Sequence, residues 1–330
     1  MKYKLVLTVA ALILLPNLTA SIAFGQAPAA FAEEPATLRI SGGELHGTLM
    51  LPKAKAAFPV VLLIAGSGPT DRNGNTPVFK EPNNSLKMLA EALAASGIAS
   101  LRYDKRGSGD AMALAGDETT LRFDTYINDA VLWAKQLRAD KRFSTLTIAG
   151  HSEGSLIGMI AAKESSADAY VSIAGLGRAA GTVILGQIRS QLPPDLMKTA
   201  ESIVADLNAG KTVAAPPQSL YVLFRPNIQP YLISWFRRDP SAEIAKLTVP
   251  VLIAQGTTDI QVSVDDAKSL SKSAPKATLT LIDGMNHVLK MVPADMDKQT
   301  RSYSDPTLPL AQPLSDAIVK FVKKVKKNKF

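Results

Sequence analysis

The sequence predicts an α/β fold with a mostly parallel central sheet flanked by helices. Short apolar runs alternate along the chain with stretches of helical periodicity, which is the pattern of repeated strand–helix units. Several runs are continuously apolar, as strands covered on both faces must be. The chain has 330 residues, 46% of them hydrophobic, which is enough to bury a large core.

Seven apolar runs are candidate strands. They are "LHGTLMLP" (45–52), "PVVLLIAG" (59–66), "IASLRYD" (98–104), "LTIAGH" (146–151), "AYVSIAG" (169–175), "PVLIAQG" (250–256) and "ATLTLID" (277–283). Between them, "NSLKMLAEALAASG" predicts a helix with a polar cap at Asn84 or Ser85 and a stop at Gly97. "YINDAVLWAKQL" (126–137) predicts another, because its apolar residues recur on one face.

The strand rhythm breaks between Leu176 and Leu247. This segment contains "GTVILGQIRSQL", "DLMKTAESIVADL" and a proline-rich stretch, all more helical or irregular than strand-like. We interpret 176–247 as a helical insertion. The sheet core then comprises 33–175 and 248–330.

The first 32 residues have the layout of a secretory signal peptide and leader. Two early lysines precede an apolar run over residues 5–15, and small residues follow. The run is shorter than the roughly 20 residues that span a bilayer, which disfavours a membrane anchor. Cleavage after Ala23 or after Ala32 fits the small residues at both places. We therefore expect an exported protein, periplasmic or extracellular, whose cysteine-free chain has no disulfides.

Basic residues gather at the C-terminus. The tail lysines are Lys323, Lys324, Lys326, Lys327 and Lys329, after the amphipathic run "LSDAIVKFV". The simplest interpretation is a last helix whose cationic end faces water and offsets the negative end of its dipole. Contact with a membrane surface is the alternative. No other cluster of basic and aromatic residues suggests nucleic acid binding.

A candidate nucleophile lies in "LTIAGHSEGSLIGM" (146–159). Ser152 is the centre of a Gly-x-Ser-x-Gly turn between a predicted strand and a predicted helix. Such a turn strains the backbone of the serine and leaves little room two residues to either side, where Gly150 and Gly154 stand. The motif alone is weak, but its placement between strand and helix strengthens it.

The serine needs a base, and the chain has three histidines. His151 is adjacent to Ser152, so its side chain is expected to point away and pack beneath the turn. His46 lies in an early strand and is most simply structural. His287, in the loop after the last strand, can reach back over the sheet and is our candidate base.

The base needs an acid that holds its tautomer. Asp259 follows the strand "PVLIAQG" and is the candidate. Asp265 and Asp266 are alternatives, but they stand at the expected start of the next helix, where acids serve as caps. The oxyanion donors are expected to be the backbone N–H groups of Glu153, after the nucleophile, and of Ser67, in the loop after "PVVLLIAG".

Other motifs in the sequence give weaker evidence of function. "YDKRGSGD" (103–110) lacks the spacing of a phosphate-binding loop. Asp71 and Arg72 fit the site entrance and a surface turn equally well.

With no cysteine and three scattered histidines, we expect no metal, and the chemistry requires no cofactor. The aromatics of "QPYLISWFRR", namely Tyr231, Trp235 and Phe236, fit either substrate contact or helix packing.

The pieces "GHSEG", "AGSGPTDRNGN", "RYDKRGSGD", "QGTTDIQV" and "MNHVLK" together resemble serine hydrolases of the α/β-hydrolase superfamily, in the bacterial esterase and serine-aminopeptidase-like branch. The order Ser152, Asp259, His287 is the order that this fold uses. The resemblance implies an α/β-hydrolase fold, a triad of these residues and a cap formed by 176–247. Many relatives have His-Gly where this chain has Ala65-Gly66, and because the oxyanion donor is a backbone group, this difference does not remove it.

The sequence therefore predicts a serine hydrolase, first a carboxylesterase acting on small or medium acyl esters. The same machinery serves a serine aminopeptidase, an acyl transferase or a thioesterase. An aminopeptidase requires an acidic group near the site to hold the substrate ammonium. A non-catalytic binding protein on the same fold is the remaining alternative.

Overall fold

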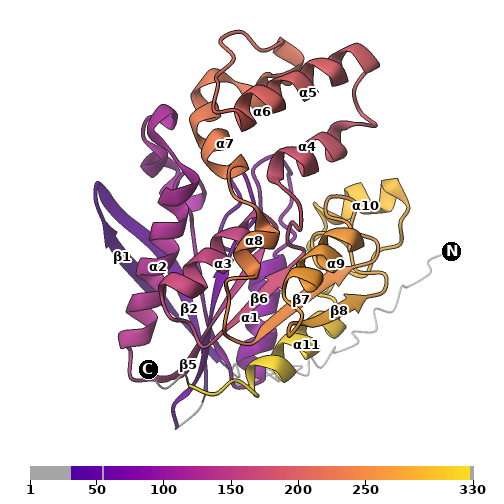
Figure 1. Cartoon of the computed structure of the whole chain (residues 1–330). Helices are drawn as coiled ribbons and strands as arrows, with labels where there is room; N and C mark the ends of the chain where they lie inside the picture. Colours follow the sequence, from indigo (N-terminus) through magenta and orange to yellow (C-terminus); the bar gives the residue numbers. More distant parts are fainter. Residues whose placement is uncertain (1–30, 54–55, 328–330) are drawn as a thin grey trace, which may run out of the picture.

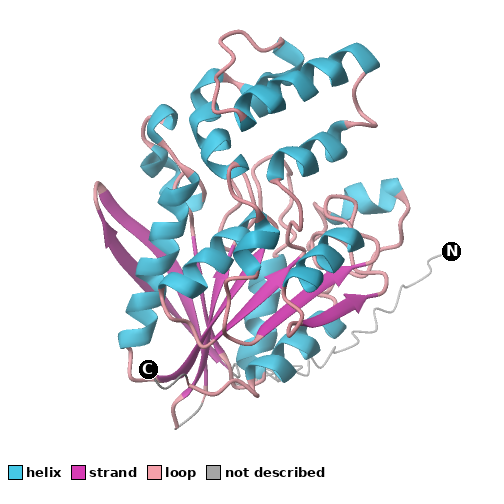
Figure 2. Cartoon of the chain, in the orientation of Figure 1, coloured by secondary structure: helices cyan, strands magenta, loops and turns pink. Residues whose placement is uncertain are grey.

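The computed structural model describes residues 31–53 and 56–327, so the predicted signal peptide lies almost entirely outside the described residues. One eight-stranded sheet crosses the molecule, with helices on both sides (Figure 2). Its strands are β1 (Phe31–Ile40), β2 (Gly43–Pro52), β3 (Phe58–Ile64), β4 (Ala99–Tyr103), β5 (Phe143–His151), β6 (Ala169–Ile173), β7 (Val251–Gly256) and β8 (Thr278–Ile282).

The spatial order of the strands is β1-β2-β4-β3-β5-β6-β7-β8. From β4 to β8 every neighbouring pair is parallel, whereas β2 runs antiparallel to both β1 and β4. The fold is the predicted α/β-hydrolase fold with a mostly parallel mixed sheet. The carboxyl ends of β3, β5 and β7 lie on one edge of the sheet, which is where ligands bind in such folds.

The helices are α1 (Ser85–Ala95), α2 (Phe123–Ala139), α3 (Glu153–Glu164), α4 (Ala180–Ile188), α5 (Pro194–Asn208), α6 (Tyr221–Phe224), α7 (Gln229–Phe236), α8 (Pro240–Ile244), α9 (Val264–Ser273), α10 (Met296–Ser302) and α11 (Gln312–Val322), with short 3₁₀ turns at Gly109–Ala115, Glu118–Thr120, Gln218–Leu220 and Pro226–Ile228. In the described part of the chain, no helix is long and apolar enough to cross a membrane.

Two apolar layers cover the sheet. On one face, α1 and α11 pack Leu89, Leu93 and Ile318 against the strands. On the other face, α2, α3 and α9 form the larger layer, which includes Trp133. The apolar strand β3 and the mostly apolar β6 are buried between these layers, as their composition predicts.

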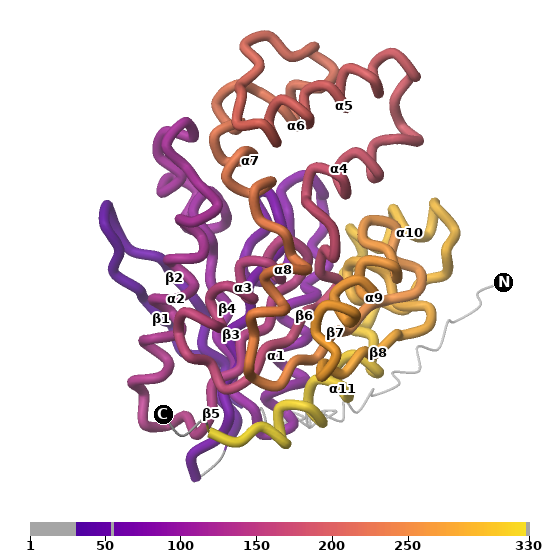
Figure 3. The backbone as a smooth tube through the Cα atoms, in the orientation of Figure 1, coloured from indigo at the N-terminus to yellow at the C-terminus, as the bar shows by residue number. Residues whose placement is uncertain are grey.

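The segment between β6 and β7 is helical, as the loss of strand rhythm predicts. It contains α4 to α8, and α4 to α7 gather at one end of the molecule beyond the sheet (Figure 1). The tube view in Figure 3 shows the chain leaving the sheet after β6 and returning through α8 to β7. We call 176–247 the cap.

Strand β1 is absent from the sequence prediction. Its ten residues are mostly exposed, and it contains Pro35, so it shows no clear apolar pattern. It pairs with β2 alone, and an edge strand tolerates a proline that a central strand would not. Strand β1 also includes Phe31 and Ala32, the last residues of the predicted leader, so cleavage after Ala32 would shorten it by its first two residues.

The last helix ends as predicted. Helix α11 stops at Val322, and the four lysines that follow it in the described chain are exposed. Lys329 lies outside the described residues. Membrane contact by this tail stays a prediction.

Candidate active site

Ser152 occupies a strained turn between β5 and α3. Its φ and ψ of 54° and −122° lie in a region that non-glycine residues rarely adopt. A Cβ on Gly150 would lie 2.0 Å from the Gly154 carbonyl oxygen, and one on Gly154 would lie 2.5 Å from that of Ile64. Only glycine fits at these two positions, so the close packing of strand, turn and helix accounts for both glycines of the motif.

His287 and Asp259 meet at the adjacent strand ends. The Nδ1–H of His287, after β8, donates to Oδ2 of Asp259, after β7, at 2.9 Å. Oδ1 of Asp259 also accepts the N–H groups of Gln261 and Val262, at 2.8 and 2.9 Å. Burial alone would raise the pKa of Asp259, but His287 and these two amides outweigh it and lower that pKa. An ionised Asp259 fixes the Nδ1–H tautomer and leaves Nε2 of His287 as an acceptor.

Ser152 and His287 line the same cavity, whose volume is about 180 Å³. Ser67 and Gly66 contribute to its wall from the loop after β3, and Gln261 contributes from the loop after β7. The other lining residues are Thr70, Gly74, Thr76, Phe79, Asn83, Ser85, His151, Val288 and Tyr303. The structure thus brings together the predicted nucleophile, base, acid and oxyanion loop at the carboxyl edge of the sheet.

The predicted place of His151, packed beneath the turn, is wrong. Its ring lines the cavity, with its centroid 4.8 Å from that of His287. Its Nε2–H donates to the His287 carbonyl oxygen at 2.9 Å, so His151 supports the loop that carries the candidate base. Burial and the neighbouring His287 lower the pKa of His151 to about 3, which keeps the ring neutral at neutral pH.

The two predicted oxyanion donors lie beside the nucleophile on different elements. Glu153 is the first residue of α3, and the first N–H groups of a helix have no partner within it. A Cβ on Gly66 would lie 3.2 Å from the Cβ of Ser152, so the loop that carries Ser67 packs directly against the turn. Ser67 is exposed at the cavity wall.

The remaining sequence candidates are structural. Asp266 forms a capping box with Ser263 at the start of α9 and pairs with Arg178 at 2.7 Å. Asp71 accepts two N–H groups of its own loop, and Arg72 pairs with the buried Asp104 of the "YDKRGSGD" turn.

His46 and Asp265 do not reach the cavity. His46 lies in β2 and pairs with Thr37 of β1, while Asp265 is exposed in the first turn of α9 and pairs with Lys268. Both therefore have the structural roles that the sequence predicts for them.

The cap aromatics pack on the core. Tyr231, Trp235 and Phe236 of α7 are buried, and Trp235 stacks on Phe123 of α2 with ring centroids 5.8 Å apart. None of the three lines the cavity. The sequence leaves substrate contact and helix packing open for these residues, and in the structure they serve helix packing.

Sequence reasoning missed several residues of the site. Phe79 and Tyr303 form one wall of the cavity, with ring centroids 5.7 Å apart, and Gln261 donates to the Tyr303 hydroxyl at 2.8 Å. Lys290 is buried beside the His287 loop, where it donates to the Leu308 carbonyl oxygen at 2.7 Å. No local pattern marks these residues, because their neighbours in space are distant in sequence.

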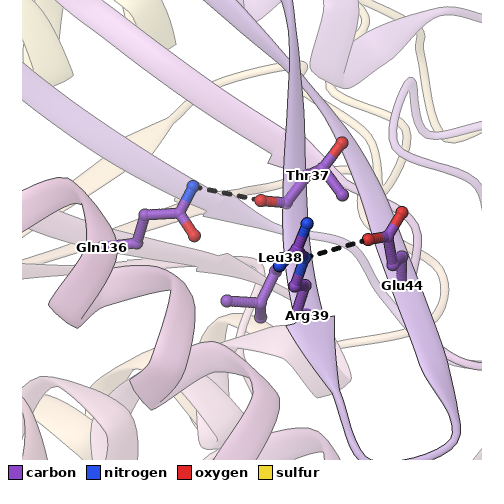
Figure 4. A pocket seen from close by; sticks show the side chains of 5 residues that line it. All are labelled: Thr37, Leu38, Arg39, Glu44 and Gln136. Carbon is purple, nitrogen blue, oxygen red and sulfur yellow. Dashed lines mark hydrogen bonds and ion pairs between the residues drawn. The ribbon is translucent and has the colours of Figure 1, made fainter.

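The structure has two further hollows, one of which adjoins the cavity of Ser152. One, between the β1–β2 hairpin and α2, is lined by Thr37, Leu38, Arg39, Glu44 and Gln136 (Figure 4). Its polar groups pair with each other: Gln136 donates to the Thr37 carbonyl oxygen and Arg39 to Glu44. The other lies along the loop from Pro69 to Pro82, includes Asp71, and shares Thr76 and Phe79 with the cavity of Ser152. Within residues 31–53 and 56–327, no group of three or more His, Cys, Asp or Glu could hold a metal.

A mixed sheet with this strand order, a serine on a strained turn after β5 and a histidine–aspartate pair after the last two strands define the α/β-hydrolase class of serine hydrolases. A family model described as serine aminopeptidase, S33, matches residues 79–221. Esterase EstD of Thermotoga maritima is 30% identical over 266 residues, which cover 79% of this chain and 61% of EstD.

Solved structures share the fold. Est1E from Butyrivibrio proteoclasticus with bound ferulic acid has a TM-score of 0.56 at 17% identity, covering 88% of this chain and 100% of Est1E. The esterase Pf2001 of Pyrococcus furiosus has a TM-score of 0.56 at 14% identity, covering 92% and 97% of the two chains. The chain thus has the α/β-hydrolase fold and is similar in sequence to EstD and to the S33 serine aminopeptidases, although it spans only about three fifths of the length of EstD.

Proposed function

We propose that the protein is an exported carboxylesterase that cleaves small or medium acyl esters with Ser152, His287 and Asp259. The observation that carries this proposal is the cavity that Ser152 and His287 share. Its volume of about 180 Å³ suits a short acyl group. The contacts around it support the roles proposed for the three residues.

In the first half of the reaction, Oγ of Ser152 attacks the ester carbonyl carbon and His287 Nε2 accepts the serine proton. Asp259 holds the imidazole orientation and stabilises the imidazolium that forms. The N–H groups of Ser67 and Glu153 receive the negative oxygen of the tetrahedral intermediate. When that intermediate collapses, His287 gives its proton to the leaving alcohol.

In the second half, water attacks the acyl-Ser152 ester. His287 accepts a proton from the water, the same two N–H groups bind the new oxyanion, and the carboxylic acid leaves as Ser152 recovers its proton. None of these steps requires a cofactor.

The lining of the cavity favours an ester over the amino-terminal peptide of an aminopeptidase. Apart from its two histidines and Tyr303, no lining residue in the described chain has a titratable side chain. A substrate ammonium would lose its hydration there without gaining a carboxylate partner. Glu153 is nearby, but its side chain is buried and paired with Lys105. A neutral ester suits this lining better.

The similar proteins agree with this choice. EstD and Pf2001 are described as esterases, and Est1E holds ferulic acid. The Phe79–Tyr303 wall of our cavity offers an aromatic surface of the kind that would accept a planar acyl group. Aryl and short alkyl esters are therefore the substrates to try first.

The test compares the mature protein with Ser152→Ala on nitrophenyl esters of increasing chain length and on aminoacyl-arylamides. We expect hydrolysis of acetate and butyrate esters, weaker hydrolysis of long-chain esters, and a loss of at least about 10³-fold in kcat for Ser152→Ala. Preference for the arylamides would favour an aminopeptidase. Equal activity of the two proteins would refute Ser152 as nucleophile.

Export is proposed from the first 32 residues, whose basic start, apolar run and small residues follow the layout of a signal peptide. The mass of the protein recovered from the periplasm or medium of an expressing bacterium tests it. We expect a chain that begins at Phe24 or at Glu33, the residues that follow the two cleavage points. A full-length chain in the cytoplasm would contradict export.

A further inference from the structure

A buried ion pair lies beneath the candidate active site. Nζ of Lys105, after β4, is 2.5 Å from Oε2 of Glu153, the first residue of α3. Each residue is 2% exposed. A buried ion pair is a poor way to stabilise a fold, because the desolvation of two charges offsets most of their attraction. Its presence here therefore calls for a role beyond stability.

The ammonium of Lys105 has a second partner, the Gly66 carbonyl oxygen, at 2.6 Å. This carbonyl and the N–H of Ser67 belong to one peptide group. The group is planar and trans, so its C=O and N–H point in opposite directions. By holding the carbonyl on one side, Lys105 directs the Ser67 N–H to the other side. A charged donor on the carbonyl also polarises the peptide and strengthens its N–H as a donor.

Glu153 carries the second proposed oxyanion donor and is also bound to the Lys105 ammonium. Its backbone N–H is the other proposed oxyanion donor, while its side chain is held by Lys105 and by the Tyr231 hydroxyl, which donates to Oε1. Burial and the nearby Glu153 raise the pKa of Tyr231 well above its usual value, so this hydroxyl stays protonated. Tyr231 belongs to α7 of the cap.

We propose that Lys105 is a positioning residue that orients the oxyanion donor of the Gly66–Ser67 peptide, and that Glu153 and Tyr231 connect Lys105 to the cap through hydrogen bonds. The inference rests on the proposed function, because it concerns the donors of that reaction. It assigns to the cap a second role, because Tyr231 of α7 bonds to Glu153 and thereby supports the catalytic geometry.

The test uses Lys105→Met/Glu153→Met, which removes both charges and leaves neither partner buried alone. We expect kcat for nitrophenyl acetate to fall about 10²-fold, with KM within about 3-fold of wild type, because one oriented donor is worth about that much. Affinity for a trifluoromethyl ketone, which forms a hemiketal oxyanion on Ser152, is expected to fall by a similar factor. A merely structural role would not produce this parallel.

Two single variants accompany it. Tyr231→Phe removes one hydroxyl and keeps the ring that packs on Phe123, so kcat is expected to fall about 3- to 10-fold. Arg106→Met is the matched control, because Arg106 is next to Lys105 but pairs with Asp129 at 2.8 Å rather than with the site. Its kcat is expected to stay within about 3-fold of wild type even if its Tm falls.

Unchanged kcat and inhibitor affinity in a folded double variant would overturn the inference, as would a rise in KM alone. If the double variant does not fold, Tyr231→Phe decides by the same two measurements. Failure of the proposed function looks different: wild type would hydrolyse no ester, or Ser152→Ala would be as active as wild type. That result would overturn both proposals.

Discussion

The histidine next to Ser152 shows how much one side chain depends on its surroundings. His151 donates to the backbone of His287 and lies against its ring, in a buried position that favours the neutral form. Its adjacency to the nucleophile in sequence suggests a base, but a ring with a pKa of about 3 is a weak one. We conclude that it holds the His287 loop in place.

This position makes stability depend on pH. The unfolded chain gives His151 an ordinary pKa of about 6.5, whereas the folded pKa is about 3. Because the folded value is the lower one, the contribution to stability is full above about pH 6.5 and is lost as the pH falls toward 3. We expect the free energy of unfolding to fall between pH 7.5 and pH 5, and to fall less in His151→Gln.

Urea unfolding of both proteins at the two pH values measures this difference. All other titratable groups are common to the two chains, so they cancel in the comparison. Equal pH dependence in wild type and His151→Gln would contradict the assignment of a depressed pKa to His151.

At the residue scale, the sequence located those groups whose place is fixed by the strand they follow. Ser152 directly follows β5, Asp259 and His287 lie in the loops after β7 and β8, and parallel strands bring such ends to one edge. Phe79 and Tyr303 also reach the site, but through a contact between distant segments that no local spacing encodes.

At the scale of elements, one helix start is predictable from local sequence and another is set by a contact with a different segment. The sequence predicts that the acids near residue 265 cap a helix, and Asp266 does so in a capping box with Ser263. Asn84, predicted as a cap residue for α1, has no side-chain cap bond and adopts a left-handed conformation. It instead accepts a hydrogen bond from the side chain of Asn75. A tertiary contact here replaces the local one.

The capping box gives a prediction for α9. Ser263→Ala removes the hydroxyl that accepts from the Asp266 N–H and donates to its carboxylate. We expect a loss of about 1 kcal/mol in the free energy of unfolding, measured by urea titration. Esterase kinetics should be unchanged, because Ser263 does not line the cavity.

Ser241→Ala is the control, because it also removes a serine hydroxyl but one that caps no helix. That hydroxyl bonds to the Gly177 carbonyl oxygen and to Ser269. Ser263→Ala with the stability of wild type would show that the box contributes nothing to α9.

At the scale of the whole molecule, the cap is joined to the core by aromatic packing. Trp235 of α7 stacks on Phe123 of α2, and Tyr231 packs edge-on against Tyr126. The sequence predicts a helical insertion at 176–247 because the strand rhythm stops there. The way it docks depends on ring contacts between α7 and α2, which periodicity does not reveal.

Weakening this contact is expected to loosen the cap. Trp235→Ala removes a side chain that is 6% exposed, at a cost of about 3–5 kcal/mol. We expect faster proteolysis and faster amide exchange within 176–247 than within the sheet. Tyr221→Ala, at a cap residue that is 42% exposed, is the control and should behave as wild type. Uniform loosening of the cap and the sheet would show that the cap does not open on its own.

The central claim is that this α/β-hydrolase acts through Ser152, and covalent labelling tests it most directly. A fluorophosphonate phosphonylates an activated serine, and peptide mass spectrometry locates the adduct. We predict one adduct per chain, on the peptide that contains Ser152, and none in Ser152→Ala. His287→Ala should slow labelling by about 10³-fold or more. An adduct on another residue, or equal labelling of wild type and Ser152→Ala, would contradict the account.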